Sequence, residues 1–325
     1  MIYDCFTFFN ELDLLEIRLN ILNDVVDKFV LVEMSKTHTG QDKPFYFDEA
    51  KSRFQKFLPK IIHIKVDDYP DLANSNSDKH GNKWLLENYQ RDQILRGLTA
   101  AQDDDIIIVS DLDEIPSPQI IKQYDNSGIW VLEQSMMYYF LNMLCYTSPT
   151  WKNGTRMARF ADLKNPQQVL PKKEFYEFSA PGLPTYFRFC QGRNIKNAGY
   201  HFSYLGGVEA IIKKRQSIVE QQFNTKENMS ADYIEKMIAS GHDILGRSKY
   251  RYIGIPLDNS FPQYILNNQD KYQKLICPIT KGWRYKLFWH NTISCLKDFL
   301  FRREKKTSGQ RNIYIFGLKV FSYKK

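Results

Sequence analysis

Several features of membrane-spanning, secreted and zinc-binding proteins are missing from this sequence. No apolar run approaches the ~20 residues needed to cross a bilayer, and the mean hydropathy is -0.48. The five cysteines are scattered and form no Cys-x-x-Cys pair, so neither a zinc site nor a disulfide framework is indicated. Residues 1–9 contain no basic segment and no small-residue cleavage site, so no signal peptide is predicted. We therefore expect a cytoplasmic protein.

A glycine-rich phosphate loop is missing as well. The sequence contains no Walker pattern and no Gly-x-Gly-x-x-Gly, and these are the common phosphate-binding motifs. The loop after the first expected strand reads Phe9-Asn10-Glu11-Leu12, which is acidic and lacks glycine. This counts against a nucleotidyltransferase, although a metal-dependent nucleotidyltransferase or phosphohydrolase stays an alternative function.

Strand-like and helix-like segments alternate through the first half of the chain. We expect strands at 2–8, 28–33, 61–66 and from 105. We expect helices at 12–22, 48–58 and 84–101. This alternation predicts an α/β fold with a mixed, mainly parallel central sheet flanked by helices. Shorter strands are expected later, at 129–134, 137–144, 155–160 and 200–204, with a helix over 208–223. We expect these strands to extend the same sheet.

The segment 105–113 reads Asp-Ile-Ile-Ile-Val-Ser-Asp-Leu-Asp and is the most informative in the chain. Its apolar run predicts a strand buried on both faces. Asp111 and Asp113 are two apart, so in an extended chain their carboxylates point the same way. They follow the carboxyl end of the strand, where open α/β sheets bind ligands. A polar turn is the simpler alternative, but a third carboxylate at Glu114 counts against it.

Paired carboxylates of this kind indicate a divalent cation. Mg²⁺ and Mn²⁺ prefer oxygen ligands, and Mg²⁺ commonly bridges carboxylates to a diphosphate. Asp111 and Asp113 therefore predict a metal-assisted site for a phosphorylated substrate.

The positive charge of the chain is concentrated at its C-terminal end. The net charge is +8, and residues 300–325 hold eight Lys and Arg against Glu304 alone. The rest is nearly neutral, which argues against nucleic acid as a partner. We therefore divide the chain into residues 1–282 and a basic, aromatic extension, residues 283–325. Each Lys or Arg near an anionic membrane contributes about 1 kcal/mol. Residues 302–325 thus predict peripheral contact with the inner face of the plasma membrane; a solvated tail with a short hairpin packed on the body is the alternative.

Six segments, taken together and in this order, resemble glycosyltransferase family 17. They are Asp4–Arg18, Val26–Glu33, Lys36–Gly40, Glu87–Asp92, Asp111–Pro116 and His201–Gly207. The resemblance covers roughly residues 3 to 270. It implies a Rossmann-like GT-A fold, a nucleotide-sugar donor with UDP-GlcNAc as the best guess, a divalent metal, and inversion at the anomeric carbon. The implied partner is a glycan or lipid-linked oligosaccharide acceptor in surface polysaccharide or glycoconjugate synthesis.

The resemblance also implies roles for individual residues. Asp111 and Asp113 are expected to hold Mn²⁺ or Mg²⁺, which stabilises the departing diphosphate. GT-A enzymes often add a late histidine to this metal, and here His201 precedes a Gly-Gly pair. A neutral imidazole suits Mn²⁺. The alternative for His201 is a structural position at a strand end.

Five further residues are expected to contact the nucleotide sugar. Asn10 and Glu11 follow the first strand, and Glu33 ends the second; helix capping and turn polarity are the alternatives. Gln90 and Arg91 lie on the helix before the Asp111 strand. Arg91 is expected to pair with Asp111 or to contact the diphosphate, while a surface pair with Glu87 is its simpler alternative.

The catalytic base is left open between several carboxylates, since an inverting enzyme needs one opposite the leaving group. The candidates are Glu114, Glu133, Glu177 and Asp243. Glu114 has a second interpretation, as a group that braces the metal loop. A non-catalytic carbohydrate- or membrane-binding module is a further alternative for the whole chain, but it leaves the carboxylate cluster without a purpose.

Overall fold

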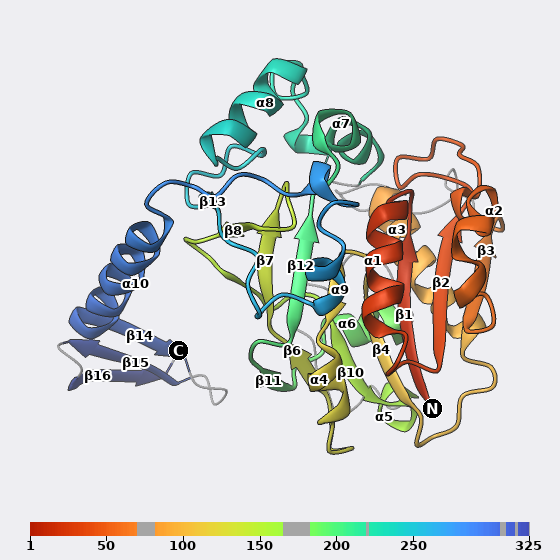
Figure 1. The fold of residues 1–325 in the computed structure, drawn as a ribbon. Helices are drawn as coiled ribbons and strands as arrows, with labels where there is room; N and C mark the ends of the chain where they lie inside the picture. Colours follow the sequence, from red (N-terminus) through yellow and green to blue (C-terminus); the bar gives the residue numbers. More distant parts are fainter. Residues whose placement is uncertain (70–81, 165–182, 219–220, 306–309, 316–317, 325) are drawn as a thin grey trace.

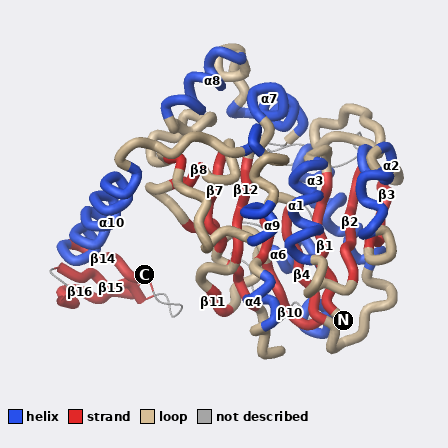
Figure 2. Tube along the Cα trace, in the orientation of Figure 1, coloured by secondary structure: helices blue, strands red, loops and turns tan. Residues whose placement is uncertain are grey.

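The chain folds into a mixed α/β structure with two mixed sheets flanked by helices (Figure 1). The computed structural model describes residues 1–69, 82–164, 183–218, 221–305, 310–315 and 318–324. The polar, turn-rich segment 67–82 and the proline-rich segment 166–184 are expected from their composition to be loops, and most of both lies outside these residues. Figure 2 shows the two large sheets side by side and a third, small sheet away from them.

The first sheet has seven strands in the order β11-β6-β10-β4-β1-β2-β3. Their bounds are β1 Ile2–Phe8, β2 Lys28–Met34, β3 Ile61–Val66, β4 Ile106–Asp111, β6 Trp130–Leu132, β10 Arg156–Arg159 and β11 Arg193–Ile195. The four strands β4, β1, β2 and β3 are parallel, whereas β10 runs antiparallel to β4 and β6. The expected mainly parallel sheet is therefore confirmed for this half of the molecule.

Helices cover both faces of this sheet, because successive side chains of each strand point to opposite faces. On β1, Phe6 and Phe8 join the buried cluster that contains Leu15 of α1 (Leu12–Leu22). Tyr3 and Cys5 belong instead to a second cluster, which includes buried residues of α3 (Asn82–Asp92), of the 3₁₀ helix η2 (Gln93–Gly97) and of α6 (Leu183–Arg188).

Three expected helices end earlier or break, because tertiary packing overrides local propensity. The segment 48–58 forms α2 (Tyr46–Glu49) and the 3₁₀ helix η1 (Lys51–Phe57), which meet at Ala50, and η1 is kinked at the buried Phe54. The expected helix 84–101 divides into α3 and η2. A Cβ on Gly97 would lie 2.4 Å from Val30 Cγ1, so η2 can approach β2 this closely only with glycine. The helix expected at 208–223 is α7 (Gly207–Ser217); Ile218 is extended, and residues 221–223 form a separate 3₁₀ helix.

The second sheet corrects part of the expectation that later strands extend the first: β6 and β10 do extend it, whereas the strands expected at 137–144 and 200–204 belong to a second sheet. It has six strands: β5 Glu114–Pro116, β7 Gln134–Tyr138, β8 Met143–Cys145, β9 Thr150–Trp151, β12 Gly199–Ser203 and β13 Tyr252–Gly254. Only two residues separate the end of β4 from the start of β5, yet β5 pairs with β12. The chain therefore passes from one sheet to the other through Leu112 and Asp113.

The remaining elements lie around the two large sheets or form the extension. They are α4 Pro118–Lys122, α5 Phe160–Lys164, η5 Gln221–Phe223, α8 Ala231–Ser240, α9 Gln263–Asn267, η6 Gln273–Leu275, α10 Trp283–Leu300, β14 Phe301–Lys305, β15 Gln310–Ile315 and β16 Leu318–Lys324. The last three strands form an antiparallel sheet. In Figure 1, α10 (blue) stands away from the body and carries this sheet at its far end.

A search of the described residues finds no helix with the length and apolar character that spanning a membrane requires.

Candidate functional site

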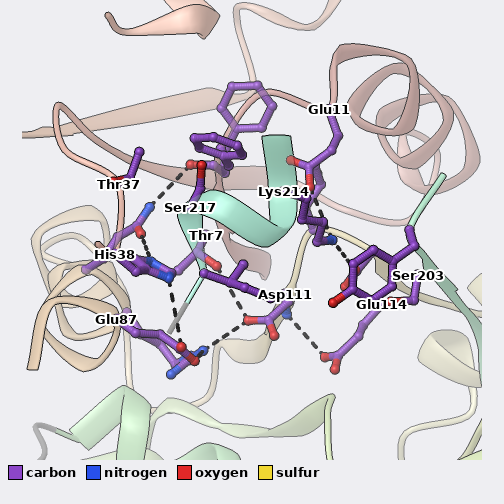
Figure 3. Close-up of a pocket in the computed structure, with 18 of the residues that line it drawn as sticks. Thr7, Glu11, Thr37, His38, Glu87, Asp111, Glu114, Ser203, Lys214 and Ser217 are labelled. Atoms are coloured by element: carbon purple, nitrogen blue, oxygen red, sulfur yellow. Dashed lines mark hydrogen bonds and ion pairs between the residues drawn. The ribbon is translucent and has the colours of Figure 1, made fainter. Parts of the chain in front are cut away.

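A cleft of about 270 Å³ lies where β1, β2 and β4 end, beside the junction of the two sheets. This is the sheet edge at which open α/β folds bind ligands. The polar side chains around it come from β1, β4, β12, α3, α7 and the connecting loops (Figure 3), and include Thr7, Glu11, His38, Glu87, Gln90, Arg91, Asp111, Asp113, His201 and Lys214.

The two aspartates of the predicted pair both line this cleft. Asp111 is the last residue of β4 and lies opposite Thr7 of β1 in the strand register. Asp113 lies in the turn between β4 and β5, and its carbonyl oxygen accepts a hydrogen bond from the backbone N–H of Phe202 at 2.7 Å. The turn is therefore held between the first sheet and β12.

A buried arginine fixes the backbone of this turn. Arg18 of α1 has no exposed surface and makes two hydrogen bonds to the Asp4 carboxylate, at 2.8 and 2.6 Å. Its Nη1 donates to the carbonyl oxygens of Asp111, Leu112 and Glu114, at 2.9, 3.1 and 3.0 Å. A buried charge is tolerated when it is paired and fully hydrogen-bonded. Sequence reasoning missed this role, since no local pattern joins Arg18 to the turn.

Asp111 is neutralised by two arginines from different helices. Arg91 Nη2 of α3 lies 3.2 Å from Oδ1, and Arg188 Nη2 of α6 lies 2.6 Å from Oδ2. Burial opposes ionisation, but Arg188 and then Arg91 outweigh it and hold the pKa of Asp111 below its usual range. Arg91 also contacts Glu87 Oε1 at 3.0 Å. Both predicted pairings of Arg91 therefore occur together, while Arg188 was not foreseen.

Asp113 is compensated in the same way by Lys214 of α7 and by His201 of β12. Lys214 Nζ lies 2.9 Å from Oδ2, and His201 Nε2 lies 3.5 Å from Oδ1. Burial opposes ionisation here too, but Lys214 and His201 hold the pKa of Asp113 well below its usual range. Lys214 also lies 3.3 Å from Glu11 Oε1 (Figure 3). The run Lys213-Lys214-Arg215 on an expected helix was the available signal for this cation.

The donor atoms decide which residues suit a divalent cation. Within the described part of the chain, no three His, Cys, Asp or Glu side chains form a group that could hold a metal. Asp111 does not fit, because both of its oxygens already face arginines. Asp113 Oδ1 and His201 Nε2 face each other, and their 3.5 Å separation suits two ligands of one cation. Protein sites for Mg²⁺ often offer one or two ligands and leave the rest to substrate phosphates and water.

Glu114 is placed as a brace and not as a proton acceptor. Its carboxylate is fully buried and accepts two hydrogen bonds from Arg188, at 2.9 and 2.8 Å. Further hydrogen bonds come from Trp151 Nε1 at 2.7 Å and from the backbone N–H of Asp111 at 3.1 Å. Both oxygens of this carboxylate are occupied by donors of the protein itself, which favours the bracing interpretation.

Glu33 is a correction to the predicted nucleotide contacts. It is fully buried at the end of β2, where it accepts hydrogen bonds from the backbone N–H groups of Tyr46 and Phe47, at 2.6 and 3.2 Å. Lys43 Nζ lies 3.2 Å from it. With its oxygens engaged inside the protein, Glu33 anchors residues 43–47 and cannot face a ligand.

Of the other four residues predicted to contact the nucleotide sugar, three line the cleft and one does not. Glu11, Gln90 and Arg91 line the cleft, whereas Asn10 does not. Gln90 donates to the carbonyl oxygens of Phe8 and Val32, at 3.3 and 3.0 Å, and its Oε1 lies 2.8 Å from His38 Nε2. It therefore ties the ends of β1 and β2 to a histidine that sequence reasoning did not select.

The remaining candidates for the catalytic base lie elsewhere. Asp243 is buried against Arg247 and Tyr252, at 2.7 and 3.0 Å, and neither it nor Glu133 lines the cleft. Glu177 lies outside the described residues. Among the described residues of the cleft wall, the other carboxylates besides Asp111, Asp113 and Glu114 are Glu11 and Glu87.

Sequence comparisons identify the family that the first half of the chain resembles. Residues 1–155 match the family model described as glycosyltransferase family 17. The chain is 24% identical to the beta-1,4-mannosyl-glycoprotein 4-beta-N-acetylglucosaminyltransferase of Homo sapiens over 320 residues, which cover 85% of this chain and 56% of the human protein. The enzyme of the same name from Rattus norvegicus is 24% identical over 302 residues, covering 82% and 53%. The chain thus spans about half the length of these curated relatives. The predicted resemblance to family 17 is confirmed.

Proposed function

We propose that this chain, a member of glycosyltransferase family 17 through residues 1–155, transfers N-acetylglucosamine from UDP-GlcNAc to a glycan hydroxyl with inversion at the anomeric carbon. The observation that carries the proposal is the meeting of Asp111, Asp113, His201 and Lys214 in one cleft at the carboxyl ends of parallel strands. A GT-A fold is part of the proposal. Its support is the largely parallel first sheet and the acidic turn that leads from that sheet into the second.

A divalent cation belongs to this proposal, with Asp113 and His201 as its protein ligands. When bound, such a cation neutralises the negative charge that develops on the leaving diphosphate. The chain supplies positive charge of its own at the same place. Lys214 borders the cleft beside Asp113, and its pKa, although opposed by burial, is raised by Asp113 and Glu11. It therefore stays an ammonium that is positioned to contact a diphosphate oxygen.

The arginines next to the cleft have a positioning role. Arg91 and Arg188 occupy both oxygens of Asp111, and Arg188 also binds Glu114. This network keeps the acidic turn in one geometry without reorganisation during the reaction, which is how preorganised charges lower a barrier. Asp111 thus orients the turn, and Asp113 contacts the cation.

We propose that the acceptor binds in a hollow of about 480 Å³ that adjoins the cleft. The two share Phe9, Thr37, Lys43 and Ser217 in their walls, so a donor in the cleft and an acceptor in the hollow would lie next to each other. An acceptor hydroxyl needs a base to remove its proton. Glu11 and Glu87 are the cleft carboxylates proposed for this step.

The test is release of UDP from UDP-GlcNAc by the purified chain with Mn²⁺, which needs no knowledge of the acceptor. We expect slow hydrolysis that is lost in Asp113→Asn, by a factor of at least about 10². Thermal unfolding should also shift upward with UDP-GlcNAc and Mn²⁺, since ligand at 100 times its Kd adds about 2.7 kcal/mol.

Asp104→Asn is the matched control, because the side chain of Asp104 is 95% exposed and lies outside the cleft. It should keep both signals. Unchanged UDP release in Asp113→Asn would rule out the proposed site, and a thermal shift with UDP-glucose but not UDP-GlcNAc would rule out the proposed sugar.

A further inference from the structure

The helix α10 exposes an apolar stripe along its length. Six large apolar side chains of this 18-residue helix are between 40% and 66% exposed: Tyr285, Phe288, Trp289, Ile293, Leu296 and Leu300. At 100° per residue they fall within an arc of roughly 140°. Soluble proteins rarely leave a contiguous apolar surface of this kind without a partner. We call these six residues the α10 stripe.

On the side opposite the stripe, the first half of the helix is less exposed and contacts the protein. Trp283, Leu287 and His290 are only partly exposed, and the same 100° rotation places them on the side away from the stripe. The ring of His290 packs edge-on against Tyr146, with centroids 5.8 Å apart. Figure 1 shows α10 extending away from the two large sheets. The stripe is therefore directed outward and is not a continuation of the core.

Basic residues surround the stripe in the sequence. Residues 281–325 contain twelve Lys and Arg but only Asp298 and Glu304, a net charge of +10, which leaves residues 1–280 at -2 out of the total of +8. Lys286 and Arg284 are exposed on α10 itself, and the helical rotation puts one on each border of the stripe. Positive charge is thus confined to the segment that carries the exposed apolar surface.

We propose that α10 lies in the interface of an anionic lipid bilayer, with the stripe toward the acyl chains and the basic residues toward the headgroups. A helix with aromatic and aliphatic residues on one side and Lys or Arg at its borders binds bilayers in this way. Tyr285 and Trp289 have the amphipathic rings that favour the membrane–water interface. Negative lipids add about 1 kcal/mol for each nearby Lys or Arg. Binding of a second protein molecule would explain the apolar stripe but would leave the net charge of +10 in the same segment unexplained.

The test is co-sedimentation of the full chain with vesicles, without any nucleotide sugar, so that it is independent of the proposed transferase activity. We expect binding to vesicles of equimolar phosphatidylglycerol and phosphatidylcholine, weak binding to phosphatidylcholine alone, and loss of binding at high salt. The double variant Phe288→Ser/Trp289→Ser should lower the affinity about a hundredfold, at about tenfold for each ring removed from lipid. Lys286→Glu should weaken binding to the anionic vesicles with the stripe intact.

Phe223→Ser is the matched control, since Phe223 is 39% exposed and lies outside the extension; it should bind like the unaltered chain. Circular dichroism verifies that each variant is folded. Equal binding of the double variant, or equal binding of the unaltered chain to both kinds of vesicle, would overturn the proposal. So would size-exclusion data in which the double variant turns a dimer into a monomer while vesicle binding is unchanged, because the stripe would then cover a second copy.

Discussion

At the scale of single residues, charge compensation defines the cleft. Asp111 faces two arginines, and Asp113 faces Lys214 and His201. Each carboxylate is thereby kept ionised in a partly dry site, where an uncompensated charge would be costly. The compensating residues are not interchangeable. Arginine forms rigid, multidentate contacts, whereas lysine is a mobile point charge that can turn toward a second anion.

Lys214→Met tests this compensation through its pH dependence. The pKa of Asp113 is depressed in the folded state, so its stabilisation is present above the unfolded pKa of about 3.9 and is lost as pH falls through the folded pKa. The pKa of Lys214 is raised, so the contribution of Lys214 to the free energy of unfolding is present below about pH 10.4. This contribution is lost as pH rises through the pKa of the folded state. Urea unfolding at pH 7 should show a loss of about 2 kcal/mol in the variant.

That loss should shrink as the pH falls below about 4, where Asp113 becomes protonated in the variant. Lys213→Met is the matched control on the same helix; Lys213 is exposed and lies 4.6 Å above the ring of Tyr46, a contact worth about 0.5–1 kcal/mol. Equal losses in the two variants, or a difference that does not change with pH, would contradict the Lys214–Asp113 pairing.

At the scale of elements, the site depends on the pairing of β5 with β12. This antiparallel pairing sets His201 opposite Glu114 and next to Asp113. It requires a close approach of two backbones at Gly199, where φ is +129° and a Cβ would lie 2.1 Å from the carbonyl oxygen of Ile115. The position of His201 therefore rests on a glycine two residues before it.

Gly199→Ala should thus cost more stability than an alanine at an unobstructed glycine. We expect a loss of about 3 kcal/mol or more in the free energy of unfolding, since backbone strain is joined by a clash with main-chain atoms. Gly40→Ala is the control, because Gly40 also has a positive φ but no atom within 4 Å of the added Cβ; its cost should be about 1–2 kcal/mol. Urea denaturation measures both, and equal costs would show that the β5–β12 contact is not tight.

At the scale of the whole molecule, the cleft and the basic extension are separate. The cleft is built from residues between Thr7 and Ile218. The extension begins with α10 and ends in the sheet β14–β16, which stands away from the two large sheets (Figure 1). Binding of a bilayer by the extension would bring the cleft near a membrane-bound acceptor without contributing to the chemistry.

Deleting residues 302–325 should therefore weaken vesicle binding more than it weakens UDP release. The deletion removes eight basic residues and Glu304. At about 1 kcal/mol per basic residue near the surface, the loss of even two contacts lowers affinity for anionic vesicles more than tenfold. UDP release should stay within about twofold of the intact chain, because none of the deleted residues that the structure describes lines the cleft. A twofold change corresponds to a difference of only ~0.4 kcal/mol in the reaction barrier. A parallel loss of both would make these residues part of the catalytic body.

Local patterns in the sequence determined much of the first sheet and its acidic turn. The strands 2–8, 28–33 and 61–66 were predicted within one residue, because apolar runs between turn residues report burial directly. The same logic brought Asp111 and Asp113 to the carboxyl end of β4. These conclusions need only neighbouring residues, and the ordered segments shared with family 17 supported them.

The tertiary structure alone decided which charges meet at the cleft. Lys214 is 101 residues from Asp113 along the chain, and Arg188 is 77 residues from Asp111. It also decided that Glu33 is buried, and that β7, β8 and β12 form a second sheet while β6 and β10 extend the first. Contacts between residues this far apart arise from sheet pairing and helix packing over the whole molecule, which side-chain periodicity along a single segment does not encode.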